Sequence, residues 1–133
     1  MPMSDVSSDL PPALKDENDA HPIAGAWRPM LRNVVQRFVA GDYLLEDGVV
    51  GVEPVSSKTA DHVRSCIAAY GATLVDLPPD TWQTSVAQWY GTHWDILVDL
   101  WTSEEGRSGL VLSGKMVETH AGPRFTIHMV YVP

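Results

Sequence analysis

Apolar and polar residues alternate over the last third of the chain, from Trp94 to Val132. The segments WDILVDLW, GLVLSGKMV and RFTIHMVYV follow this period of two, and short polar turns separate them. A period of two is typical of strands that bury one face of a sheet, and short connections favour antiparallel neighbours. The pattern therefore predicts three consecutive strands that form a β-meander.

Two earlier segments place apolar residues at helical spacing instead. The first covers residues 23–40, has a proline near its start, where helices tolerate one, and is followed by Gly41 as a stop. The second begins after a cap at Ser56 or Ser57 and ends at Tyr70. Because each helix has one apolar stripe, each needs a partner layer, and the sheet supplies it.

Shorter segments complete the predicted sheet. Residues 49–55 and 72–77 each predict a short strand. Residues 81–90 fit a strand or a helix, and we favour the strand because YGTH, residues 90–93, has the glycine-first pattern of a two-residue hairpin turn. The sequence therefore predicts the α+β class, with two N-terminal helices packed on one face of a mainly antiparallel sheet that ends in a β-meander.

The turns also predict which residues face each other across the sheet. The hairpin turn at residues 90–93 places Trp82 opposite Trp101. The later turns place Asp95 opposite Lys115 and Lys115 opposite His128.

Alternation sorts the strand residues onto two faces. One face is apolar enough to pack on both helices and consists of Trp89, Trp94, Ile96, Val98, Leu100, Leu110, Leu112, Met116, Phe125, Ile127, Met129 and Tyr131. The other mixes polar and large apolar side chains, namely Gln88, Asp95, Lys115, His128, Trp82, Val86, Leu97, Trp101, Val111, Val117, Val130 and Val132. Such a face is either a contact surface for a partner protein or a second copy, or it is covered by other segments of the same chain.

Length and charge narrow the choice of function. The chain has 133 residues, of which 44% are hydrophobic, enough for one domain with a single core. Residues 1–20 carry five acids and one base and lack the pattern of a secretory signal, so we expect an acidic disordered tail there and a single domain over 21–133.

The formal net charge of -8 disfavours nucleic acid as a partner and favours a basic protein or a cation. The single cysteine, Cys66, excludes an intrachain disulfide and agrees with a reducing compartment, so we expect a cytoplasmic location. No stretch approaches the roughly 18 continuous apolar residues that a membrane span needs.

Three side chains of the second face are candidates for acid–base catalysis. Asp95, Lys115 and His128 combine a carboxylate, an amine and an imidazole, which can serve acid–base catalysis in a pocket, but exposed ion pairs between strands have the same pattern. No nucleophile motif or phosphate loop accompanies them, Cys66 has no nearby base of the kind a nucleophilic pair requires, and the histidines lack metal-ligand spacing. We therefore expect no metal and no cofactor.

The turn SEEGR and its neighbours suggest a binding surface. The candidate binding residues are Trp82, Asp99, Trp101, Glu104, Glu105 and Arg107. Their acids form a lip beside an aromatic anchor, a composition that suits a basic partner surface. The arginine can equally pair with one of the acids, in which case the segment is a polar turn that needs no ligand.

The runs VDLWT and EEGRS, residues 98–102 and 104–108, resemble those of a small family of uncharacterised bacterial cytoplasmic proteins. The likeness is densest over Trp94 to Leu112 and departs from the family pattern at Gly109, where the family has an acid. The family has no assigned catalysis, and some relatives resemble immunity proteins that neutralise a toxin.

Two classes of function stay open. The first is a non-enzymatic protein-interaction module that uses the acidic and aromatic sheet face. An immunity-type protein is a narrower form of this class. The alternative is a small enzyme or ligand-binding protein similar to the nuclear-transport-factor-2-like fold, with a pocket near Asp95, Asp99 and His128. A flat exposed face favours the module, and a buried pocket at those residues favours the enzyme.

Overall fold

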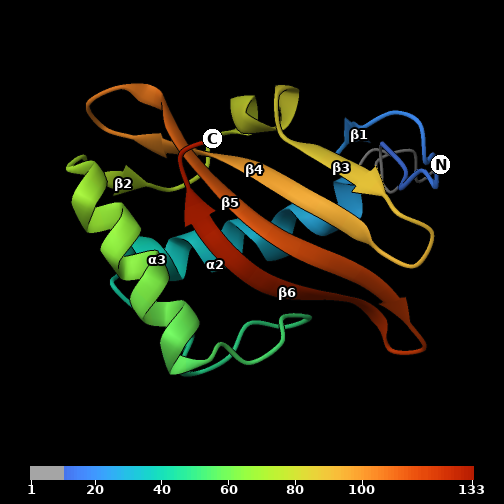
Figure 1. Ribbon diagram of the computed structural model, residues 1–133, viewed down its shortest axis with the longest axis horizontal. Helices are drawn as coiled ribbons and strands as arrows, with labels where there is room; N and C mark the ends of the chain where they lie inside the picture. Colours follow the sequence, from blue (N-terminus) through green and yellow to red (C-terminus); the bar gives the residue numbers. More distant parts are fainter. Residues whose placement is uncertain (1–10) are drawn as a thin grey trace, which may run out of the picture.

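The computed structural model describes residues 11–133 and has an α+β architecture (Figure 1). Its elements in chain order are β1 (His21–Pro22), the 3₁₀ helix η1 (Gly25–Trp27), α2 (Arg28–Val39), α3 (Ser57–Tyr70), β2 (Leu74–Val75), the 3₁₀ helix η2 (Pro79–Gln83), β3 (Val86–Trp89), β4 (Trp94–Thr102), β5 (Gly106–Thr119) and β6 (Gly122–Tyr131). The strands form one sheet in the order β1-β3-β4-β5-β6, and β2 pairs with the far end of β4. Both α-helices lie on one face of this sheet, which confirms the predicted fold class.

α3 begins and ends where the sequence predicts, whereas α2 begins at Arg28, after η1, and not at residue 23. A proline lies in the first turn of α2, and the Ser56 hydroxyl accepts a hydrogen bond from the Thr59 backbone N–H at the start of α3. Gly71 ends α3 with a φ of 84°, a left-handed conformation that glycine adopts without strain. The apolar stripes of both helices are buried in one core with the inner face of the sheet, to which β4 contributes Trp94, Ile96, Val98 and Leu100.

The strand predicted at residues 49–55 is wrong, because this segment is a loop that touches the sheet at one point. Val52 forms an isolated parallel bridge to Phe125, flanked by the hydrogen bonds from Phe125 N–H to Gly51 O and from Glu53 N–H to Phe125 O. Gly51 has a φ of 84°, and a Cβ there would lie 2.3 Å from the Met30 side chain. This glycine turns the chain where a strand would have to continue straight.

The segment at residues 81–90 is a strand only in its second half. Its first half forms η2, in which the Ser85 N–H donates to Thr81 O and the Thr81 hydroxyl donates to Asp99 O at 2.6 Å. Trp82 is therefore buried in the core and does not face Trp101, which corrects the predicted pairing. From β3 onward the register set by the glycine turn is confirmed, with Gln88 opposite Asp95 and Val86 opposite Leu97.

An earlier turn and a β-bulge both change the predicted pairing of β5 with β6. Asp95 lies opposite Lys115 as predicted, but Lys115 lies opposite Thr126 and not His128. The turn lies one residue earlier in the chain than expected, so its closing pair is Thr119 and Gly122. The register shifts again between Ser113 and Gly114. Residues beyond the bulge exchange faces as a result.

The exchange is visible in the burial of β6. Val130, predicted to lie outside, is fully buried opposite Leu112, whereas Met129, predicted to lie in the core, is 39% exposed. Tyr131, also predicted to lie in the core, is half-buried opposite Val111. An extra residue in one strand reverses the alternation beyond it, so the hydrophobic pattern of the end of β6 was assigned to the wrong face.

Residues 11–20, the second half of the predicted tail, contact the domain through their backbone. The Trp94 indole N–H donates to Leu14 O at 3.0 Å, and the Gly25 N–H donates to Pro11 O at 2.8 Å. The remaining part of the predicted tail, residues 1–10, lies outside the described residues. In the part of the chain that the structure describes, no helix has the length and apolar character to cross a membrane.

Candidate functional site

The face of the sheet opposite the helices is the surface that the sequence analysis singled out, and we call it the outer face. The strand register gives its members as Val86, Gln88, Asp95, Leu97, Asp99, Trp101, Val111, Ser113, Lys115, Val117, Arg124, Thr126, Met129 and Tyr131. Among the described elements, no helix covers this face (Figure 1). Apart from the buried Val111 and the exposed Met129, its residues are half-buried.

The polar row predicted on this face, Asp95, Lys115 and His128, is assembled only in part. Asp95 lies directly opposite Lys115, yet its carboxylate contacts the His93 imidazole, with 3.1 Å between Oδ1 and Nε2. Within residues 11–133, no ion pair joins Asp95 to Lys115. His128 is exposed at the bulge and is not opposite Lys115. The three groups therefore do not form the row that the acid–base hypothesis needs.

The predicted acidic lip is held by contacts within the chain. The Glu104 carboxylate accepts hydrogen bonds from the Thr73 backbone N–H at 2.8 Å and from the Thr73 hydroxyl at 2.9 Å, and these lower the Glu104 pKa. The Glu105 carboxylate accepts a hydrogen bond from the Tyr70 hydroxyl at 2.8 Å. Asp99 accepts a hydrogen bond from the Thr84 hydroxyl. The acids thus tie the β4–β5 loop to the end of α3 and to the start of β2.

The two candidate tryptophans lie in different places. Trp82 belongs to the core, with the Arg28 guanidinium 5.4 Å from its ring centroid. Trp101 is half-buried at the end of the outer face, opposite the exposed Arg107, and its ring lies beside Gly106. Of the aromatic anchor predicted from the sequence, only Trp101 remains on the outer face.

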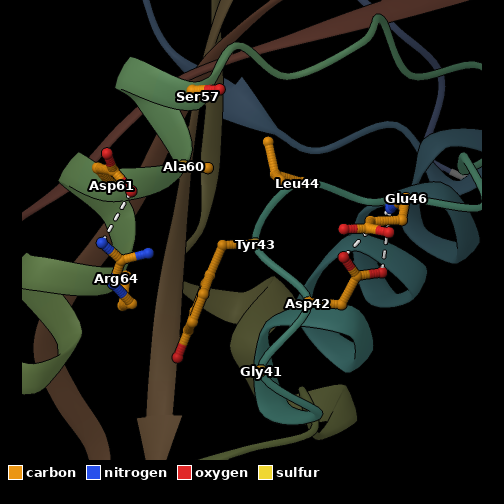
Figure 2. Close-up of a pocket in the computed structure, with 9 residues that line it drawn as sticks. All are labelled: Gly41, Asp42, Tyr43, Leu44, Glu46, Ser57, Ala60, Asp61 and Arg64. Atoms are coloured by element: carbon orange, nitrogen blue, oxygen red, sulfur yellow. Dashed lines mark hydrogen bonds and ion pairs between the residues drawn. The ribbon is translucent and has the colours of Figure 1, made fainter.

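One cavity lies away from the outer face. It has a volume of about 380 Å³ and opens between the loop after α2 and the start of α3 (Figure 2). The charged groups that line it contact one another or the backbone: Asp61 pairs with Arg64 at 2.7 Å, and the Asp42 carboxylate accepts a hydrogen bond from the Glu46 backbone N–H. Neither this cavity nor three smaller ones among the described residues is lined by Asp95, Asp99 or His128. These cavities therefore give no support to the enzyme alternative.

The sequence analysis missed a base beside the cysteine. Cys66 lines an apolar cavity of about 310 Å³ with Tyr70 and Tyr131, and its Sγ lies 3.7 Å from His62 Nε2. The signal was present, since residues four apart lie on one face of a helix. Within residues 11–133, no group of three or more His, Cys, Asp or Glu side chains is arranged to hold a metal ion.

The comparisons with known proteins agree with an uncharacterised family. The model of the family described as Domain of unknown function (DUF7668) matches residues 35–133, which is more than half of the chain. No curated protein matches the chain. No solved structure matches it either. The chain belongs to the DUF7668 family, which is defined by a domain of unknown function.

Proposed function

We propose that this protein is a non-enzymatic protein-interaction module and that the outer face is its contact surface. The observation that carries the proposal is that this face presents large apolar side chains while no helix of the described chain covers it. Leu97 lies at its centre, between Val86 and Ser113, and Met129 is 39% exposed at its edge. Large apolar side chains that remain partly exposed on a sheet face are common at interaction sites.

The partner that best suits this face is a second copy of the chain. The chain has a net charge of -8, but the outer face carries both signs: Asp95 lies opposite Lys115, and Arg124 pairs with Glu53 at 2.8 Å. Two copies can therefore meet here without the repulsion that the rest of the acidic surface creates. In a twofold pairing, Lys115 of one protomer can approach an acid of its partner, so one patch complements itself.

An immunity-type role is the narrower form of the proposal. In that role a toxin, and not a second copy, would contact the outer face. The support for it is that the VDLWT and EEGRS runs resemble a family in which some relatives resemble immunity proteins. These runs lie at the end of β4 and from the loop after it into the start of β5. A monomer in solution would favour this partner over a second copy.

Sedimentation velocity over a range of protein concentrations tests the proposal. We expect the parent to show a monomer–dimer equilibrium and Leu97→Glu to remain monomeric, because a charge at the centre of an apolar contact is left without a partner. Leu44→Glu is the matched control, since Leu44 is 40% exposed on a loop outside the outer face. Circular dichroism checks that both variants fold. A parent that stays monomeric at every concentration contradicts the pairing of two copies.

A further inference from the structure

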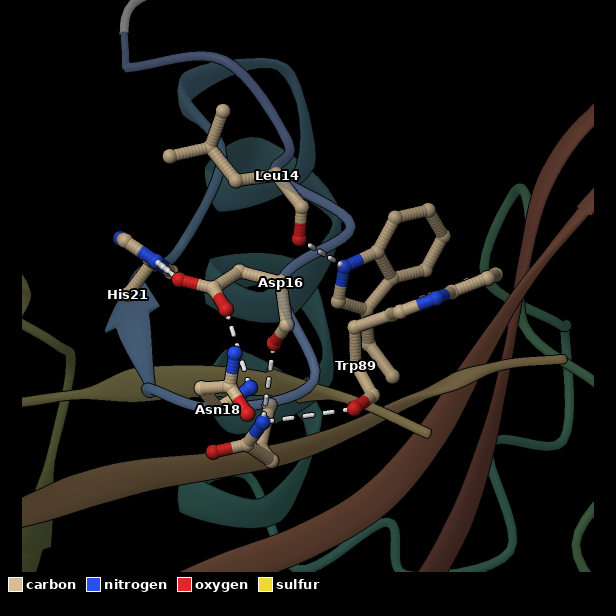
Figure 3. Close-up of polar contacts among 7 residues, drawn as sticks. Leu14, Asp16, Asn18, His21 and Trp89 are labelled. Carbon is tan, nitrogen blue, oxygen red and sulfur yellow. Dashed lines mark hydrogen bonds and ion pairs between the residues drawn. The ribbon is translucent and has the colours of Figure 1, made fainter. Parts of the chain in front are cut away.

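The N-terminal segment adds a strand to the edge of the sheet. In β1, His21 pairs with Ala87 and Pro22 pairs with Val86, so the segment lies antiparallel to β3. The preceding residues run past the β3–β4 hairpin (Figure 3). The addition of a peptide strand to an exposed sheet edge is a general mode of peptide recognition.

The domain contacts the backbone of this segment through two side chains. Trp94 Nε1 donates to Leu14 O at 3.0 Å, and Gln88 Nε2 donates to Asp16 O at 3.0 Å (Figure 3). Hydrogen bonds to carbonyl oxygens depend on the path of a peptide and not on which side chains it carries. Two donors that bind carbonyls two residues apart therefore fix the position and direction of a segment.

One side chain of the segment is recognised as well. The ammonium group of Lys15 lies 5.1 Å from the Trp89 ring centroid and 5.9 Å from the Trp94 ring centroid. It also pairs with the Glu118 carboxylate at 2.9 Å. Two indole rings and a carboxylate form a site suited to a cation. Both side chains of the ion pair are more than half exposed, so the ion pair is weak and can break and re-form.

The N-terminal segment and the residues that contact it differ in their position relative to the family model. Gln88, Trp89, Trp94 and Glu118 all lie within the residues that the family model matches, whereas residues 11–22 precede it. The site thus belongs to the family domain, and its occupant is an addition to that domain. The segment also has its own local contacts, between Asp16 and both His21 and Asn18, which give it a defined shape (Figure 3).

We propose that Gln88, Trp89, Trp94 and Glu118 form a docking site for a peptide that carries a lysine side chain, and that residues 11–22 occupy this site in cis. The segment acts as an intramolecular competitor. A peptide from a partner protein binds when it displaces the segment, and the effective concentration of the tethered segment sets the affinity that such a peptide must reach.

The test uses a fluorescent peptide with the sequence of residues 11–22, added to the full-length protein and followed by fluorescence anisotropy. Lys15→Glu in the protein weakens the hold of its own segment by removing the cation–π contacts and the ion pair. We expect this variant to bind the peptide about tenfold more tightly than the parent does. Lys58→Glu, the same charge change at an exposed position on α3, is the control and should behave like the parent.

A second variant keeps the test decisive if Lys15→Glu does not fold. Glu118→Lys changes the exposed end of β5 and reverses the charge that the site offers to residue 15. This protein should prefer a peptide that carries the Lys15→Glu change over the natural peptide. Equal peptide affinity of the parent, Lys15→Glu and Lys58→Glu proteins would overturn the proposal. The absence of peptide binding to all of them, or an unchanged preference in Glu118→Lys, would also overturn it and make residues 11–22 a fixed part of the fold.

Discussion

Gly114 shows how one residue decides the shape of the sheet. It lies in β5 beside the bulge, and a Cβ at this position would come within 2.4 Å of the Phe125 ring and 2.5 Å of Thr126 O. The Phe125 ring packs directly over Gly114, so β5 and β6 come closer together here than a residue with a side chain would allow. The alternation of β5 contains no sign of this contact, so the sequence did not predict the bulge.

We expect Gly114→Ala to lower the free energy of unfolding by about 1–3 kcal/mol, because the added methyl group has to displace a buried ring or a backbone carbonyl. Gly109→Ala is the control in the same strand, since its Cβ would meet the Tyr70 hydroxyl at 3.4 Å, an ordinary contact. Urea denaturation of both variants measures the difference. Equal stability of the two would show that Phe125 does not pack as described.

At the scale of the elements, local signals predicted what local contacts determine. The caps of α3 and the turn after β3 depend on a few neighbouring residues, and each lies where the sequence predicts. The loop at residues 49–55 and η2 depend on distant contacts, such as the hydrogen bond from Thr81 to Asp99 O. Periodicity carries no information on such contacts, so both segments were assigned to strands.

The β4–β5 loop gives a pH-dependent prediction at this scale. Thr73 donates two hydrogen bonds to the Glu104 carboxylate, and this lowers the pKa of Glu104 in the folded state. A carboxyl whose pKa is lower in the folded state contributes its full stabilisation above the unfolded-state pKa, about 4.3 for glutamate, and loses it as pH falls through the folded-state value. Glu104→Gln should therefore unfold at a lower temperature than the parent at neutral pH, and the gap should narrow below about pH 4.

Thermal unfolding from neutral pH to the acid range measures this gap. Glu46→Gln is the control, because Glu46 is an exposed acid whose carboxylate accepts no hydrogen bond from the described residues. A Glu104→Gln gap that is constant across the range would mean that the Thr73 contact does not stabilise the charged carboxylate.

At the scale of the whole molecule, the candidate site was predicted better as a surface than as a set of residues. The sequence predicted an outer face that mixes polar and large apolar side chains, and the register places Leu97, Trp101 and Lys115 on it. Trp82 is not on that face because η2 places it in the core. His128 is not opposite Lys115 because the β5–β6 turn closes earlier than predicted and pairs Lys115 with Thr126. The structure also adds a second surface, the edge of β3 with the N-terminal segment, which had been expected to form part of a tail.

The most direct test of the outer face as a contact surface is the concentration dependence of amide chemical shifts in the ¹⁵N-labelled full-length protein. We predict that dilution shifts the amide signals of β4, β5 and β6 around Leu97 and Lys115, because those strands leave the contact with the second copy. Signals from α3, on the opposite side of the sheet, should stay in place. Shifts that do not depend on concentration, or that change only on the helical side, would contradict the account.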